Sequence, residues 1–218
     1  MVMFSSDVDI LKCEPILFGE LYLPSQVLAG GTGAVLSGTT LTASDANFEQ
    51  AGVCAGGVIY LRSADGSLDG SYEIVSVDSA TQLTVSVLRS DATDAPIPPV
   101  AAEDIAYRVS TFGPQAKDAA FQLTQYFGIQ PGNPTSAITS DDIVDIEGLR
   151  RASVLLVISA VYTMWSDEMN CETFGRKGRL YKQLFQEARQ RCHLSMDLGS
   201  DGIVDITRLG GAIRLVQD

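Results

Sequence analysis

The chain has 218 residues, of which 45% are hydrophobic and 19% are charged, a composition typical of a folded globular protein. Its formal net charge of −12 argues against a general nucleic-acid-coating role, because such proteins neutralise phosphates with many lysines and arginines. The charge is uneven: residues 1–112 carry 4 Lys and Arg against 14 Asp and Glu, and residues 113–218 carry 11 against 13. We therefore expect two parts of unlike chemistry and a structural, assembly-forming protein rather than an enzyme.

The first part begins with a predicted helix over residues 7–21, capped by Ser6 or Asp7, which Pro15 should kink or end. From residue 27 to residue 109 the apolar residues follow period two in short runs divided by glycine-rich or Asp/Ser-rich turns, which is typical of antiparallel strands. We expect a compact β-barrel, since closure removes exposed strand edges. Residues 91–104 mix proline with acidic residues and are expected to form a solvated loop, either a linker or an intersubunit contact.

The second part has a helical period. Three helices are expected: one from Pro114 to Gly128, one over residues 146–166 and one over residues 172–193. The apolar stretch of the middle helix is shorter than the roughly 20 residues that a bilayer requires, so we expect a buried core helix and no membrane association. Residues 203–216 are expected to form a strand, or a tail that orders on a partner.

The predicted fold class is α+β: an antiparallel helical bundle with an inserted small antiparallel β-barrel or sandwich and an extended C-terminal tail. Four domains are expected. They are an N-terminal helix that joins the bundle (1–24), the β insertion (25–111), the helical bundle (112–196), and a C-terminal turn with a strand or tail (197–218).

Candidate chemistry is sparse. The single histidine, His193, follows Cys192, and neighbours in a helix point to different faces, so a helix-terminal cation is favoured over a catalytic pair. The glycine-rich stretch 29–34 lacks the Gly-Lys-Ser/Thr ending of a phosphate loop, which favours a turn before a strand. The four cysteines form no CxxC pair, so we expect reduced, mostly packed thiols, and the N-terminus does not read as a signal peptide. No catalytic residue and no cofactor is predicted.

Residues 197–208 partly match a calcium loop, with acidic residues at its first, fifth and ninth positions, namely Asp197, Asp201 and Asp205. Gly202 occupies the required sixth position. However, Gly199 removes one ligand, and Arg208 stands where the bidentate glutamate belongs. The segment is thus a weak calcium candidate, and the alternative is an Asx/Gly turn before a terminal strand.

The predicted interaction residues fall in two groups. The first is the set of cations on the last long helix, Arg176, Lys177, Arg179, Lys182, Arg189 and Arg191. Such a stripe is either a solvated face, a contact for the acidic β half of a neighbouring subunit in a head-to-tail ring, or a DNA contact. The second group is apolar and C-terminal, and comprises Ile203, Val204, Ile206, Ile213 and Leu215.

Four stretches in this order resemble the head-tail connector proteins, the adaptor or head-completion proteins of tailed bacteriophages and phage-like particles. They are the β insert over residues 37–91, the helix ASVLLVISAVYTMWS, the helix YKQLFQEARQRC and the tail DLGSDGIVDITR. The resemblance covers most of the chain and rests on pattern and order rather than on a diagnostic motif. The β insert is larger than a minimal helical adaptor requires.

The resemblance implies a virion structural protein made in the host cytoplasm and located in the neck, at the head-tail interface. It implies a homo-oligomeric ring, expected to be a dodecamer, between the portal protein and the tail or neck proteins. DNA would pass through the channel of this ring without sequence-specific binding. The alternatives are a tail-completion or baseplate structural protein, and a β recognition module on the particle.

Overall fold

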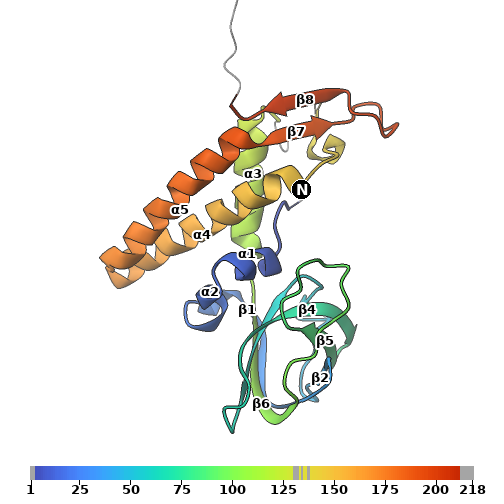
Figure 1. Ribbon diagram of the computed structural model, residues 1–218, viewed down its shortest axis with the longest axis vertical. Helices are drawn as coiled ribbons and strands as arrows, with labels where there is room; N and C mark the ends of the chain where they lie inside the picture. The colour runs from blue at the N-terminus through green and yellow to red at the C-terminus, as the bar shows by residue number, and fades with distance from the viewer. Residues whose placement is uncertain (1–2, 130–132, 134, 137, 212–218) are drawn as a thin grey trace, which may run out of the picture. The chain divides into compact units, whose positions relative to one another are not determined.

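The computed structural model describes residues 3–129, 133, 135–136 and 138–211. It divides the chain into two compact units. One unit comprises residues 6–112, and the other comprises residues 1–5 together with residues 113–218. Figure 1 shows the first unit as helices and a barrel, and the second as helices with a small sheet.

The first unit opens with two short helices, α1 (Asp7–Cys13) and α2 (Ile16–Gly19), followed by the 3-10 helix η1 (Pro24–Gln26). A capping box fixes the start of α1: the Ser6 hydroxyl accepts a hydrogen bond from the Asp9 N–H, and the Asp9 carboxylate accepts one from the Ser6 N–H. Pro15 separates the two helices, as the sequence predicted, because a proline inside a helix lacks the required N–H.

Six antiparallel strands then close into a barrel in the order β1-β2-β5-β4-β3-β6 (Figure 1). The strands are β1 (Val27–Ser37), β2 (Thr40–Thr42), β3 (Val58–Ser63), β4 (Asp69–Ser79), β5 (Gln82–Ser86) and β6 (Ala102–Ser110). The hairpin predicted around residues 72–87 corresponds to β4 and β5, in which Val77 pairs with Leu83. Most residues of the loop that precedes β6 are exposed, and Arg89 holds this loop by donating to the carbonyls of Ala92 and Asp94.

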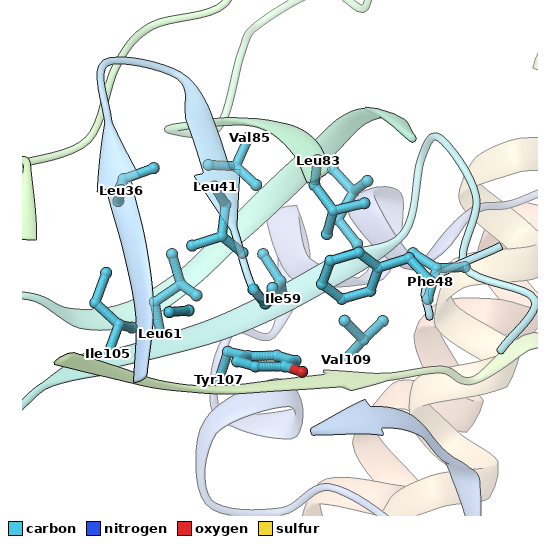
Figure 2. Packing of buried hydrophobic residues seen from close by; sticks show 14 of the residues in the cluster. Leu36, Leu41, Phe48, Ile59, Leu61, Leu83, Val85, Ile105, Tyr107 and Val109 are labelled. Carbon is cyan, nitrogen blue, oxygen red and sulfur yellow. The ribbon is translucent and has the colours of Figure 1, made fainter. Parts of the chain in front are cut away.

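Side chains fill the barrel interior (Figure 2). Phe48 enters from the loop after β2 and stacks edge-on against Tyr107, with 5.8 Å between the ring centroids. The glycine-rich stretch 29–34, which the sequence favoured as a turn before a strand, lies inside β1. At one of its positions a side chain would not fit. A Cβ at Gly31 would lie 2.9 Å from the Tyr107 hydroxyl oxygen, closer than van der Waals contact permits. The barrel interior is therefore a packed core, and Gly31 leaves the space that the Tyr107 side chain occupies.

The second unit contains the helices α3 (Gly113–Tyr126), α4 (Glu147–Met169) and α5 (Glu172–Arg191), and the 3-10 helix η2 (Ser140–Asp142). Helices α4 and α5 form an antiparallel hairpin, and α3 packs across α4 (Figure 1). Close approach of α4 and α5 depends on Gly178, where a Cβ would lie 3.0 Å from the Thr163 hydroxyl oxygen. The Ser159 hydroxyl also donates to the Gly178 carbonyl at 2.9 Å.

The fold class expected from the sequence is wrong in two respects, although helix and sheet are mixed as in an α+β protein and the sheet is a closed barrel. The helices do not form a simple antiparallel bundle, because a two-stranded sheet completes their core. The part of the predicted tail that the structure describes, up to residue 211, is also not extended. It folds back as β8 (Ile206–Leu209) on β7 (His193–Met196), and this sheet buries Leu194 and Met196 against the helices.

The unit boundaries differ from the four domains drawn from the sequence. Residues 6–24, including α1 and α2, group with the barrel, while residues 3–5 group with the helices. In the helical unit, Phe4 is buried and the hydroxyls of Ser5 and Ser153 lie 2.8 Å apart. The C-terminal turn and strand also belong to the helical unit rather than standing apart from it.

Candidate assembly surfaces

The six cations predicted as interaction residues all lie on α5, but the structure divides them by role. Arg176, Arg179, Lys182 and Arg191 are exposed. By contrast, Lys177 donates to the Tyr162 hydroxyl at 2.9 Å, and Arg189 stacks over the Tyr126 ring at 3.9 Å. These last two side chains take part in internal packing.

One face of α5 combines positive charge with an exposed apolar side chain. Arg176, Arg179 and Lys182 are spaced i, i+3, i+6, which places them along one side of the helix, and Leu180 lies beside Arg176 at one border of this stripe, four residues further along. The exposed fraction of Leu180 is 53%. In the part of the chain that the structure describes, no carboxylate pairs with these three cations. We call Arg176, Arg179, Leu180 and Lys182 the basic face.

The small sheet after α5 has a buried side and an open side. Strand β7 pairs with β8 in antiparallel register, with Leu194 opposite Arg208 and Ser195 opposite Thr207. Because side chains alternate along a strand, the burial of Leu194 places Ser195 on the open side. Thr207 pairs with Ser195 and is on the same side. Leu209, two residues after Thr207, is therefore also on the open side, and it is exposed.

The chain before α4 extends this sheet on the other edge of β7. The Val144 N–H donates to the Ser195 carbonyl at 3.0 Å, and the Asp197 N–H donates to the Asp142 carbonyl at 2.9 Å. An isolated bridge between Ile143 and Met196 lies between these two bonds. Val144 therefore projects on the open side, where 52% of its surface is exposed. We call this open side, with the loop 197–205, the outer sheet face.

Negative charge surrounds the outer sheet face. Residues 141–147 and 197–205 contain seven carboxylates and no lysine or arginine. Of these seven carboxylates, Glu147 forms an ion pair with Arg150 on α4. No cation of the described residues pairs with the six aspartates, namely Asp141, Asp142, Asp145, Asp197, Asp201 and Asp205. Asp197 is buried, so the rim is formed by the other carboxylates. The face thus joins exposed apolar side chains to a negative rim whose aspartates no lysine or arginine of the described residues pairs with.

Contacts with α3 hold the hairpin in place. The Tyr126 hydroxyl donates to the Gly210 carbonyl, and the Arg208 guanidinium donates to the Phe127 carbonyl. The Gly210 N–H donates in turn to the Cys192 carbonyl at 2.8 Å. Arg208, which replaces the glutamate of a calcium loop, is therefore occupied at the end of α3.

In the calcium candidate, each of the three carboxylates accepts hydrogen bonds from the backbone. Asp197 accepts from the N–H groups of residues 201 and 202, Asp201 accepts from residue 203, and Asp205 accepts from residues 198 and 199. No group of His, Cys, Asp and Glu among the described residues has an arrangement that could hold a metal ion. The geometry is that of an Asx-turn loop leading into β8.

The remaining candidates separate in space. Cys192 points inward, where its thiol lies 3.1 Å from the Gly148 carbonyl oxygen and burial raises its pKa, while His193 is exposed. The expectation of mostly packed thiols is wrong, because Cys13 and Cys54 are exposed and Cys171 is half-buried. Ile203 and Val204 are exposed in the 197–205 loop, and Ile206 packs against the core. Ile213 and Leu215 lie outside the described residues.

Val144 and Asp141 were absent from the residues predicted as a site, although the sequence contains a signal for them. The segment SDDIVDI at residues 140–146 matches SDGIVDI at residues 200–206 in six of seven positions. Both copies flank β7, but in different registers, because Met196 lies opposite Ile143 in one copy and Ile206 in the other. This repeat marks both acidic edges of the outer sheet face.

The comparisons with known proteins return no match to a family model, to a curated protein or to a solved structure. Within the described residues, no helix is both long enough and apolar enough to cross a membrane. The geometry of the two surfaces and the resemblance in sequence pattern therefore carry the functional argument.

Proposed function

We propose that this chain is a virion structural protein, a head-tail connector that forms a homo-oligomeric ring between the portal and the tail. The observation that carries the proposal is the opposite charge of separate surfaces in one chain. Helix α5 exposes four cations, Arg176, Arg179, Lys182 and Arg191. By contrast, carboxylates outnumber cations by 14 to 4 in residues 6–112, and residues 141–147 and 197–205 contain seven carboxylates and no lysine or arginine. A chain with complementary surfaces can bind copies of itself head to tail, and a ring results when the rotation closes.

The exposed apolar residues support an assembly role. On the helical unit, exposed apolar side chains accompany charges of both signs, with Leu180 on α5 and Val144 on the outer sheet face. Specific protein interfaces combine apolar anchors with a polar and charged rim. Each face has this composition, which suits contact with proteins.

The place in the particle comes from the resemblance. We propose that the ring has twelve copies, contacts the portal protein on one side and tail or neck proteins on the other, and lies in the virion neck. The acidic balance suits a channel through which DNA slides, since carboxylates repel phosphates. In this proposal the chain has a structural rather than a catalytic role.

Mixing the purified chain with portal rings from the same genome, and imaging the product by electron microscopy, tests the proposal. We expect a second ring stacked on the portal, absent when either protein is imaged alone. A chain that ignores portal rings and binds tail tube or baseplate would overturn the connector in favour of a tail-completion protein. A barrel that binds glycans, with no portal binding, would instead support a recognition module.

A further inference from the structure

The basic face and the outer sheet face occupy opposite ends of one compact unit. The basic face lies in the first half of α5, near the α4–α5 turn, whereas β7 begins two residues after α5 ends (Figure 1). Both belong to the unit of residues 113–218, so their separation is set by the length of a packed helix. If one surface binds the other on the next copy, their fixed spacing makes each copy rotate by the same angle relative to its neighbour.

The two faces also match in chemistry. The basic face offers three cations along one side of α5, bordered by the exposed Leu180, and none of the three pairs with a carboxylate among the described residues. The outer sheet face offers exposed apolar side chains, including Val144, within a rim of carboxylates. Contact would bury the exposed apolar side chains and pair opposite charges beside them, a combination that protein interfaces commonly show.

The barrel is a less suitable partner for α5. The carboxylates at one barrel end come from the β3–β4 turn and the start of β6, which the pairing of Ser63 with Ile105 brings together. Arg62 is exposed at the same end and lies 4.0 Å from Asp69, which reduces the negative field there.

We infer that the basic face of α5 docks on the outer sheet face of a second copy of this chain. This inference rests on the proposed ring, and it names the surfaces that join neighbouring subunits. It also gives a role to the 140–146 and 200–206 repeat, whose aspartates supply much of the negative rim. Association should weaken as salt rises, because ions screen charges across about 10 Å at 0.1 M ionic strength.

Sedimentation velocity at low ionic strength, over a wide range of protein concentration, tests the inference with charge-reversal variants. One variant is R176E/R179E, and the other is D141K/D201K. We expect each to weaken self-association by on the order of 100-fold, because like charges then face each other across the contact. A 1:1 mixture of the two variants should restore association, since each surface again meets its opposite.

Two further variants complete the set, one as a control and one as a second test of the basic face. D45K/E49K is the control: it makes the same +4 change in net charge as D141K/D201K, on exposed residues of the barrel unit, and it should self-associate like the natural chain. L180E replaces an exposed apolar side chain of the basic face by a carboxylate, and it should weaken association. Circular dichroism establishes that each variant is folded.

The inference is overturned by a natural chain that stays monomeric at every concentration, by reversals that leave association unchanged, or by a mixture that does not recover it. If D45K/E49K lost association while the other variants kept it, the contact would lie on the barrel unit instead. These results are separable from the connector proposal, because portal binding by a chain that does not self-associate would leave that proposal standing.

Discussion

The carboxylate of Asp7 accepts a hydrogen bond from the backbone N–H of Phe112 at 2.8 Å. These residues are close to the first and last positions of the barrel unit, so the bond closes the unit where the chain enters and leaves it. Burial raises the pKa of Asp7 to about 6, and the hydrogen bonds from Phe112 and Thr111 oppose that rise in part. Asp7 therefore links the stability of this closure to pH.

Because of Asp7, the free energy of unfolding of the barrel unit should decrease as the pH rises from about 4 to about 6. In that window the folded chain holds a proton that the unfolded chain has released, so the free energy of unfolding decreases as pH rises. Relative to D7N, the natural chain should lose on the order of 2–3 kcal/mol from pH 4 to pH 7. Urea unfolding followed by circular dichroism at each pH measures this difference.

Fluorescence of Trp165, the single tryptophan, supplies a control, because it reports on α4 in the other unit. The D7N substitution should leave that transition where it is. A difference between the two chains that does not vary with pH would contradict the buried, proton-binding Asp7.

Much of the barrel and of α4 follows from local pattern. The strands show period two, and the hairpin between Tyr72 and Val87 has a polar turn that the sequence makes visible. The small sheet could not be found this way, because β7 and β8 are four residues each and are joined across an acidic loop. Their position depends on Tyr126 and the end of α3, more than 80 residues earlier in the chain.

The candidate site was predicted only in part, because it too depends on contacts between residues far apart in the chain. Periodicity placed the cations on a helix, but it did not separate the exposed Arg176 from Arg189, whose stacking on Tyr126 requires the folded α3. The outer sheet face needs the pairing of Val144 with Ser195, which brings together residues about 50 apart. Local reasoning has no access to such a pairing.

Gly210 should be necessary for closure of the hairpin. A Cβ at this position would lie 2.0 Å from the Arg189 carbonyl oxygen, a backbone atom that has little freedom to move. We expect G210A to cost about 1–3 kcal/mol and to expose β8 amides to exchange. Hydrogen exchange of β8 measures the change, and G199A is the matched control because its Cβ would meet nothing nearer than 3.7 Å. Equal protection of β8 in both variants would contradict this role.

The buried ion pair between Glu73 and Arg89 should be costly to break. The Glu73 carboxylate lies 2.6 Å from one guanidinium nitrogen of Arg89, and each side chain is 6% exposed. Removal of Glu73 leaves a buried cation, so E73A should lower the free energy of unfolding by about 3–5 kcal/mol. R62M, which removes an exposed pair, should change it by less than about 1 kcal/mol. Denaturant unfolding compares the two, and similar losses would contradict the burial of the pair.

Calcium should not stabilise the chain. The carboxylates of Asp197, Asp201 and Asp205 accept backbone hydrogen bonds, and the Arg208 guanidinium bonds to the end of α3. A ligand that binds only the folded state stabilises it by RT ln(1 + L/Kd), where L is the free ligand concentration, so the melting temperature rises as the ligand concentration exceeds Kd. We expect identical melting curves with calcium and with a chelator. A dose-dependent rise that D197N abolishes would instead establish a calcium site.

The most direct test of the connector proposal is a cryo-electron microscopy reconstruction of the chain bound to its portal, at a resolution that shows helices. We predict one ring of this chain between portal and tail, with α5 of each copy against the β7–β8 sheet of the next. A chain located at the distal end of the tail, or bound to the particle as separate monomers, would contradict the account.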